Sequence, residues 1–257
     1  MKHTYSVYGG DARQTYLAAQ LMQAGCPVIH TTDTVRFRDV VALPIPSVTP
    51  EGQLRGTKLP FDTLLRAAPR GTVFFGSGFA PYRALGEELG LRLCDVNDFP
   101  AFAAANAVPT AEGALQIAME ELPGTLSGGK YLVIGYGRIG RALAERLAAL
   151  GGQVTVARRD PGSPLPWRQD RTGAYELPLS GYDAVFSTAP APVFSEEDCR
   201  RTREDCLLID LASAPGSIAK DCGRRLIHAL GLPARVAPKT AAAALCALIL
   251  SETEESA

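Results

Sequence analysis

The segment from Lys130 to Arg159 constrains the fold more than any other part of this chain. It holds an apolar run, a glycine-rich turn, an Ala- and Leu-rich stretch with helical periodicity, a Gly-Gly stop and a second apolar run. That order predicts strand, turn, helix and strand. Gly135, Gly137 and Gly140 form a GxGxxG pattern between the first strand and the helix, which is the context that dinucleotide binding requires. The sequence therefore predicts a nucleotide-binding unit here.

Each glycine of this turn has a predicted task. Gly135 permits a tight turn, Gly137 lets the backbone approach a pyrophosphate, and Gly140 lets helix and strand pack closely. The start of the helix adds free N–H groups and the positive end of a dipole. We therefore expect cofactor contacts from the whole turn, namely Gly135, Tyr136, Gly137, Arg138, Ile139 and Gly140.

The end of the second strand predicts which dinucleotide binds. NAD-binding units usually carry a carboxylate about 20 residues after the glycines, where it accepts a hydrogen bond from the ribose 2′-hydroxyl. Here Arg158 lies 21 residues after Gly137, and Arg159 follows it. Two guanidinium groups attract a 2′-phosphate, so the sequence predicts NADP(H). The alternative interpretation is that both arginines form a solvated strand end.

Composition limits the class of protein. The chain has 257 residues, enough for two domains, with 46% hydrophobic and 21% charged residues, as in ordinary globular proteins. Its net charge of −1 predicts binding to neither nucleic acid nor a membrane surface. No run of about 18 apolar residues occurs, and the first residues lack a signal-peptide pattern, which predicts a cytoplasmic protein. The six cysteines lack CxxC spacing, so we expect no metal site.

The N-terminal part repeats the order of strand, glycine turn and helix. A β-type run over residues 4–8 leads into Gly9 and Gly10, a helical segment over 15–24 and a β-type run over 27–30. Because the complete GxGxxG is missing, we expect a second α/β domain that binds no nucleotide. Similar patterns predict strands over 40–43, 73–76 and 91–95 and helices over 61–67 and 82–89.

The rest of the chain predicts a helix from Pro109 to about Leu122, with Thr110 and Glu112 near its start. Residues 160–181 are expected to form a loop with at most a short strand over 174–177. Further strands are expected over 182–187, 206–211 and 225–230, and a last helix over 240–251.

Together these elements predict an α/β fold of two Rossmann-like doubly wound domains with an interdomain cleft. The expected bounds are 1–108 for an N-terminal substrate or partner domain and 109–238 for the NADP-binding domain. The C-terminal helix, residues 239–257, is expected to pack back on the N-terminal domain. Ligands of such sheets bind beyond the carboxyl ends of the strands. The residues after two strands are therefore predicted as further cofactor contacts, namely Thr188, Ala189, Pro190 and Ala212.

Five short segments carry a family resemblance. GGDAR (residues 9–13), PTAEGA (109–114), GYGRIG (135–140), DLASAPG (210–216) and GLPARVAPKTA (231–241) resemble, in kind and order, those of the A subunit of bacterial dipicolinate synthase. Ala234 and Ala242 depart from the pattern, because glycines are expected at both positions.

The resemblance implies NADP-dependent formation of pyridine-2,6-dicarboxylate, the acid stored with calcium in endospores. The precursor would be a dihydro- or 4-hydroxy-tetrahydrodipicolinate from the lysine pathway. The resemblance also implies a partner, the flavoprotein-like B subunit, in the mother-cell cytosol of a sporulating bacterium. A homodimer is a further expectation.

A substrate of this kind is a small dianion, so its site must neutralise two carboxylates. Arg13 and Lys239 are the cations that we expect to bind them, although an ion pair between Arg13 and Asp11 that only ties a loop is the alternative. Ser213 and Thr240 are expected to hydrogen-bond a substrate carboxylate, and Asp11 is expected among the substrate-binding residues as well. For Ser213, contact with the nicotinamide amide or capping of a turn is the alternative. Glu112 is expected to accept a proton or to orient Lys239, and a carboxylate in a helix's first turn explains it equally well.

Two other functions stay open from the sequence. One is a dehydrogenase of the 2-hydroxyacid type, which requires a histidine supported by an acid. His228 has no obvious carboxylate partner in sequence. It could be a general base, and a satisfied surface or core histidine is the simpler interpretation. The other is a non-catalytic subunit that binds NADPH and supports the B subunit. Ser195 lacks a GxSxG turn, so we do not expect it to be a nucleophile.

Overall fold

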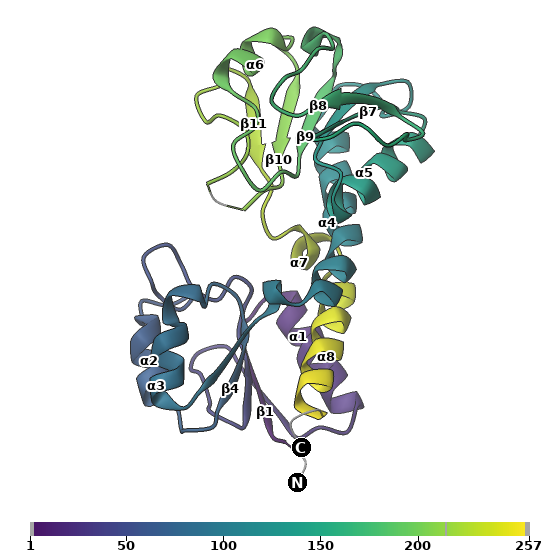
Figure 1. Ribbon diagram of the computed structural model, residues 1–257. Helices are drawn as coiled ribbons and strands as arrows, with labels where there is room; N and C mark the ends of the chain where they lie inside the picture. Colours follow the sequence, from purple (N-terminus) through teal and green to yellow (C-terminus); the bar gives the residue numbers. More distant parts are fainter. Residues whose placement is uncertain (1–2, 214, 255–257) are drawn as a thin grey trace. The chain divides into compact units, whose positions relative to one another are not determined.

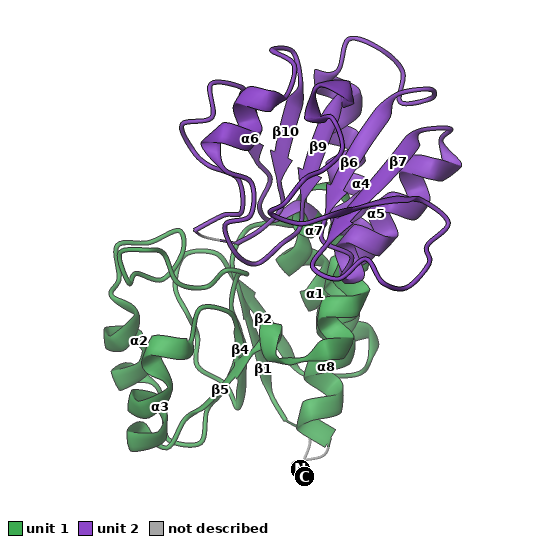
Figure 2. Ribbon diagram, turned by 45° about the horizontal axis from the view of Figure 1, so that its top comes forward, with its two compact units in different colours: residues 1–106, 233–257 green, residues 107–232 purple. Residues whose placement is uncertain are grey.

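The computed structural model describes residues 3–213 and 215–254. The chain forms two compact units, residues 1–106 with 233–257 (unit 1) and residues 107–232 (unit 2), as Figure 2 shows. Each unit has a parallel sheet covered by helices, so the predicted two-domain α/β fold is confirmed. The predicted interdomain cleft and the predicted domain bounds stay predictions.

Unit 1 contains a five-stranded parallel sheet in the order β2-β1-β3-β4-β5. Its strands are β1 (Tyr5–Tyr8), β2 (Val28–Thr31), β3 (Val40–Ala42), β4 (Val73–Gly76) and β5 (Arg92–Asp95). Its helices are α1 (Ala12–Gln23), α2 (Phe61–Ala67), α3 (Arg83–Leu89) and α8 (Pro238–Glu254), with short 3-10 turns at Ala80–Tyr82 and Val96–Asp98.

Both faces of this sheet are buried, because successive side chains of a strand point to opposite faces. In β1, Tyr5 and Val7 pack with α1 and α8, whereas Tyr8 packs with α2. Figure 1 shows α1 and α8 on one side of the sheet and α2 and α3 on the other. The packing of α8 on α1 buries Ala242 and Leu245 completely. The last helix is thus part of the core of unit 1.

Unit 2 contains a six-stranded parallel sheet in the order β11-β10-β9-β6-β7-β8. Its strands are β6 (Lys130–Ile134), β7 (Gln153–Arg158), β8 (Arg168–Arg171), β9 (Ala184–Ser187), β10 (Leu207–Asp210) and β11 (Arg225–His228). Its helices are α5 (Arg138–Ala149), α6 (Glu196–Arg201) and most of α4 (Pro100–Glu121), with a 3-10 turn at Leu179–Gly181. Helix α7 (Leu232–Val236) begins at Leu232, the last residue of unit 2, and continues into unit 1.

Helix α4 differs from the prediction. It begins at Pro100 and carries Pro109 inside it, so Thr110 and Glu112 lie in the middle of a helix rather than near its start. A proline and the residue before it usually mark a helix boundary, which is why the sequence pattern placed the start there. Burial of Ala107, Ala111 and other small side chains on this helix outweighs that local preference.

The edge of the unit 2 sheet also differs. Residues 174–177 form no strand, and the strand lies earlier, in β8, where Thr155 pairs with Arg168. The sequence of β8, RQDR, has no apolar alternation, because an edge strand needs few apolar side chains. Asp170 accepts hydrogen bonds from the backbone of Glu176 and Leu177 and so fixes the following loop.

No helix in the described part of the chain combines the length and apolar character that a membrane span requires. Residues 3–213 and 215–254 also contain no group of three or more His, Cys, Asp or Glu side chains that could hold a metal ion.

Candidate functional site

The glycine turn between β6 and α5 is built so that only glycine fits at two positions. Gly135 has a φ of +93°, and a Cβ on it would lie 2.5 Å from Thr188 Oγ1. A Cβ on Gly140 would lie 2.0 Å from the Gly135 carbonyl oxygen. A Cβ on Gly137 would meet nothing within 4 Å. The turn therefore packs helix against strand at its two ends and stays open at Gly137.

The start of α5 has the properties of an anion site. Gly137 is the N-cap residue, so no side chain accepts a hydrogen bond from the first backbone N–H groups of the helix. The first turn contains no acidic residue and begins with the exposed Arg138. Free N–H groups, the positive end of the helix dipole and a cation together favour a negatively charged ligand here.

A hollow of about 580 Å³ lies beside this turn. It is formed by the glycine turn, the residues at the end of β7 and the segment that follows β9. The structure thus brings together eight of the predicted cofactor residues, and it adds Asp160, Thr172, Ala191 and Val193. The lining residues are Gly135, Tyr136, Gly137, Arg158, Arg159, Asp160, Thr172, Thr188, Ala189, Pro190, Ala191 and Val193. Four predicted contacts do not line it: Arg138, Ile139, Gly140 and Ala212.

The two arginines of the hollow differ in how they are held. Arg158 Nε donates to Gln169 Oε1 at 2.9 Å, and its Nη2 donates to the Ser163 carbonyl. Arg159 is exposed, and the described residues give its side chain no hydrogen bond or ion pair. Arg158 is thus fixed in place by β8 and the preceding loop, while Arg159 is free to reach a ligand.

Asp160 was missed by the sequence reasoning, although it lies 20 residues after Gly140 and the signal was present. It lines the hollow next to the arginines, and its Oδ1 accepts a hydrogen bond from the Gly162 backbone at 3.0 Å. A carboxylate at this place is the usual partner of a ribose 2′-hydroxyl. The site therefore combines a carboxylate, typical of NAD binding, with arginines, typical of NADP binding.

Tyr136 is held by two neighbours that the sequence did not single out. Its ring meets the Trp167 ring edge-on, with centroids 5.8 Å apart, and the Arg141 guanidinium lies 5.3 Å from its centroid. Such contacts stabilise by roughly 0.5–1.5 kcal/mol each. They fix the side chain in the middle of the glycine turn.

Thr188 has a structural contact in addition to its place in the hollow. Its backbone N–H and its hydroxyl both donate to the Ile134 carbonyl, at 2.8 and 3.1 Å. This hydroxyl also fills the space where a side chain on Gly135 would lie. Thr188 therefore ties the end of β9 to the glycine turn.

In unit 1, Asp11 and Arg13 are largely engaged within the chain. Asp11 is the N-cap of α1, and its Oδ1 accepts from the Gln14 backbone at 2.9 Å. Arg13 is 4% exposed, donates to the Ile45 carbonyl at 3.0 Å and lies 3.9 Å from the Asp11 carboxylate. Burial lowers the pKa of Arg13, and the charge of Asp11 partly opposes that shift. These contacts fit the alternative interpretation of a loop tie.

Lys239 and Thr240 are exposed in the first turn of α8, so Lys239 lies inside the helix and not before it. Its carbonyl accepts a hydrogen bond from Gln20 of α1 at 3.2 Å. The departures at Ala234 and Ala242 need no glycine, because both residues lie in helices, α7 and α8, and no non-glycine residue among those described has a positive φ.

Glu112 pairs with Arg146, with Oε1 and Nε 3.5 Å apart and both side chains partly exposed. The prediction that it stands in a helix's first turn is wrong, since α4 begins twelve residues earlier. The ion pair joins α4 to α5 inside unit 2.

Ser213 is exposed after β10, and His228 is the last residue of β11. His228 Nδ1 lies 3.9 Å from Oδ2 of Asp210, a fully buried carboxylate. His228 therefore has a carboxylate partner that is not obvious in the sequence. The two residues are 18 positions apart in sequence, and only the pairing of β10 with β11 places them opposite each other.

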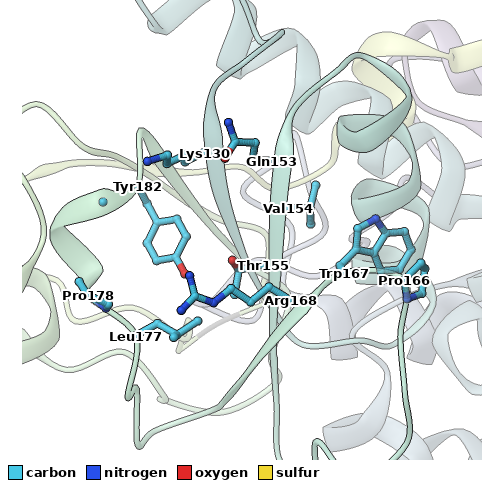
Figure 3. Close-up of a pocket in the computed structure, with 11 residues that line it drawn as sticks. Lys130, Gln153, Val154, Thr155, Pro166, Trp167, Arg168, Leu177, Pro178 and Tyr182 are labelled. Carbon is cyan, nitrogen blue, oxygen red and sulfur yellow. The ribbon is translucent and has the colours of Figure 1, made fainter.

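A second hollow, of about 500 Å³, lies near the amino ends of β6 and β7, where Lys130 and Gln153 begin those strands. Figure 3 shows Tyr182, Thr155 and Arg168 pointing toward one another within it. Burial raises the pKa of Tyr182, and a hydrogen bond to Thr155 partly offsets that rise. The glycine turn follows the opposite end of β6, so this hollow is separate from the candidate nucleotide site.

Known proteins match the chain in sequence and in structure. Residues 130–211 match the family model described as NADP oxidoreductase, coenzyme F420-dependent. The chain is 26% identical to the A subunit of dipicolinate synthase from Bacillus subtilis (strain 168) over 92% of its own length and 91% of that protein. It resembles the A subunit of dipicolinate synthase. The resemblance predicted from the sequence is thereby confirmed.

Solved structures agree in fold. The A subunit of dipicolinate synthase from Bacillus halodurans superposes with a TM-score of 0.84 at 24% identity, covering 96% of this chain and 97% of that one. D-lactate dehydrogenase from Escherichia coli superposes with a TM-score of 0.63 at 14% identity, covering 98% and 97%. At these identities the likeness shows the fold alone. Together with the family match, it gives unit 2 the fold of oxidoreductases that bind pyridine nucleotides.

Proposed function

We propose that unit 2 binds NADP(H) in the hollow beside the glycine turn. The pyrophosphate would lie at the uncapped start of α5, and the adenosine 2′-phosphate would be bound by Arg159, with Arg158 held beside it by Gln169. The observation that carries this proposal is the meeting of two arginines and a glycine turn in one hollow. Opposite charge and the N–H groups at the helix start supply the attraction.

The test replaces the two arginines with the residues of an NAD-binding site. The double variant Arg158→Asp/Arg159→Ser should bind NADPH at least 10-fold more weakly and shift preference toward NADH, measured by nucleotide fluorescence. The control Arg200→Asp makes a similar charge change on α6 and should leave both affinities unchanged. Unchanged selectivity in the double variant would refute the 2′-phosphate assignment.

NAD(H) is the second candidate, because Asp160 also lines the hollow. If Asp160 accepts from a ribose 2′-hydroxyl, Asp160→Ser should weaken NADH binding and leave NADPH binding unchanged. If the hollow binds a 2′-phosphate, the same substitution removes a repulsive charge and should strengthen NADPH binding. The single variant thus separates the two nucleotides.

We further propose that the chain is the A subunit of a dipicolinate synthase. Together with a B subunit, it would form pyridine-2,6-dicarboxylate from a dihydro- or 4-hydroxy-tetrahydrodipicolinate in the mother-cell cytosol of a sporulating bacterium. The support is the similarity to such an A subunit over nearly the whole chain. The oxidation of a dihydro ring removes one hydride, which NADP⁺ accepts when bound, and one proton, and it leaves an aromatic ring.

For the substrate we propose Lys239 as the main cation, with Thr240 and Ser213 as hydrogen-bond donors. Lys239 is exposed, whereas Arg13 is buried and already donates to the Ile45 carbonyl. Arg13 and Asp11 would then shape the loop next to the substrate. Glu112 is proposed to position Arg146 rather than to accept a proton, because the two form an ion pair.

The activity test uses the purified chain with NADP⁺ and freshly generated dihydrodipicolinate. Pyridine absorbance should appear with the chain alone, and Lys239→Ala should abolish it while NADPH binding stays near normal. Absorbance that appears only after adding the B subunit would favour a shared site. If the B subunit gives the same pyridine absorbance with a variant of this chain that cannot bind the nucleotide, this chain has a non-catalytic supporting role.

A further inference from the structure

Asp210 and His228 form an acid–histidine pair at the carboxyl ends of β10 and β11. They are register partners in the sheet, and Nδ1 of His228 lies 3.9 Å from Oδ2 of Asp210. The Asp210 side chain is completely buried, whereas the His228 side chain is 41% exposed. Nδ1 thus lies within ion-pair distance of a buried carboxylate, although beyond hydrogen-bond distance.

The carboxylate of Asp210 is held firmly. Oδ1 accepts from the Ala212 backbone at 3.0 Å and from the Ser217 hydroxyl at 2.8 Å. Oδ2 accepts from the backbones of Ser217 and Ile218, at 2.7 and 3.1 Å. Gly216 leaves room for the histidine, since a Cβ there would lie 2.9 Å from Oδ2 and 3.5 Å from His228 Cε1. A carboxylate fixed by four donors can set the orientation of a neighbouring imidazole.

The Asp210–His228 pair lies on the side of the sheet where we expect the nicotinamide half of the nucleotide. The arginines that would bind the adenosine phosphate lie at the end of β7, on one side of the glycine turn of β6. A dinucleotide extends across the carboxyl edge of the sheet, so its nicotinamide half lies on the other side, over β9 and β10. Strand β11 is next to β10, about 5 Å further along.

We propose that His228 accepts the proton that leaves the substrate when its ring is oxidised, with Asp210 as the positioning residue. This inference rests on the proposed function. The dihydro ring loses a hydride, with its two electrons, to NADP⁺, and a proton to Nε2 of His228. The imidazolium then releases this proton to solvent, and the charge of Asp210 stabilises it meanwhile.

The surroundings of His228 contain few other charges. Strand β11 is the edge of its sheet, so β10 is its only neighbouring strand among the described residues. Among the residues that the structure describes, Asp210 has the one carboxylate within 4 Å of the imidazole nitrogens. Arg225, on the same strand, is paired with Glu121 of α4. Asp210 is therefore the charged neighbour that can position the imidazole.

The first experiment measures turnover against pH for His228→Gln, for Asp210→Asn and for the control His3→Gln. His228→Gln should lower kcat by about 10²- to 10⁴-fold and remove the fall of kcat at low pH, because no group then has to lose a proton first. Asp210→Asn should lower kcat less and displace the pH profile. The control should match the wild type, and NADPH affinity should change less than about twofold in all three, since none of these side chains is assigned to the nucleotide.

Imidazole rescue separates a chemical role from a structural one. His228→Ala should recover turnover when imidazole is added to the solution, whereas a merely misfolded variant should not. A His228→Gln variant with wild-type kcat and an unchanged pH profile would overturn the inference, and so would His228→Ala without any rescue.

A second readout does not depend on turnover. The chain has three histidines, so the ring-proton resonance of His228 can be assigned by its loss in His228→Gln. Adding dipicolinate to the protein with NADP⁺ should shift this resonance and leave that of His3 unchanged. If the wild type shows no turnover with or without the B subunit, the proposed function fails, and an unmoved His228 resonance separately overturns the role given to His228.

Discussion

The two units contain the same local arrangement with opposite outcomes. In each, an inner strand of a parallel sheet, β1 or β6, runs into a glycine turn and then a helix. In unit 1, Asp11 caps α1 by accepting from the Gln14 backbone, and Arg13 is buried behind it. In unit 2, Gly137 caps α5 with no side chain, and the first turn has no acid.

The difference shows what turns a common βα turn into a ligand site. The N–H groups at a helix start need an acceptor. In unit 1 the chain supplies a carboxylate of its own, whereas in unit 2 the position is left open, a hollow lies beside it and two arginines line that hollow. The order of strand, glycine and helix is thus shared, and the residue at the N-cap decides whether an external anion is needed.

The largest difference between the units is expected when one glycine in each turn is replaced by alanine. Gly140→Ala would place a Cβ 2.0 Å from the Gly135 carbonyl oxygen, so backbone must move, whereas Gly10→Ala meets only an ordinary contact at 3.7 Å. We expect Gly140→Ala to lower the free energy of unfolding by about 1–3 kcal/mol and NADPH affinity by about tenfold or more. Gly10→Ala should change both only slightly. Denaturant unfolding and NADPH fluorescence measure the two effects, and equal behaviour of the variants would remove the contrast.

The next largest effect is expected when the N-cap of α5 is given the residue type that caps α1. Gly137→Asp places a carboxylate in open space at the start of α5, where it can cap the helix as Asp11 caps α1. Stability should rise by a few tenths of a kcal/mol, because Asp is a slightly better N-cap than Gly. NADPH affinity should fall at least tenfold, because the new charge repels a pyrophosphate.

The matched variant is Asp11→Ala in unit 1. It should cost about 1 kcal/mol of stability through the lost cap and leave NADPH affinity unchanged. Undiminished NADPH binding by Gly137→Asp, measured by fluorescence titration, would contradict an anion site at the start of α5.

The sequence predicted the elements whose pattern is local. The GxGxxG turn, the buried strands and the arginines at the end of β7 each depend on residues close in sequence. The start of α4 was missed because Pro109 imitates a helix boundary, while small side chains packed in unit 2 carry the helix across it. The edge strand β8 was missed because its residues are polar.

The candidate site was predictable to the same extent. Arg158 and Arg159 follow from their spacing to the glycines. Asp160 follows from the same rule, although the arginines before it indicate the other nucleotide. The contacts of Tyr136 with Trp167 and of His228 with Asp210 depend on how distant segments pair, and no spacing along the chain reports them.

The smallest expected effect is on the pH dependence of the free energy of unfolding, through one buried thiol in each unit. Burial raises the pKa of Cys206, in unit 2, to about 12 and that of Cys94, in unit 1, to about 11. Both values exceed the ordinary value of 9.0, so the folded chain keeps protons that the unfolded chain releases. This contribution to stability is complete below pH 9 and decreases as the pH rises toward the folded-state values.

Cys206→Ala should therefore flatten the decrease in the free energy of unfolding above pH 9, even though the cavity it leaves lowers stability at every pH. Cys94→Ala should do the same over a narrower range that ends near pH 11, because the pKa of that thiol is less raised. Urea unfolding at pH 8, 9, 10 and 11 measures the slopes of both variants against the wild type. If the slopes for Cys206→Ala match the wild type, the unfolded chain ionises this thiol no more readily than the folded chain does. Burial of Cys206, directly before β10, would then not affect the pH dependence of stability.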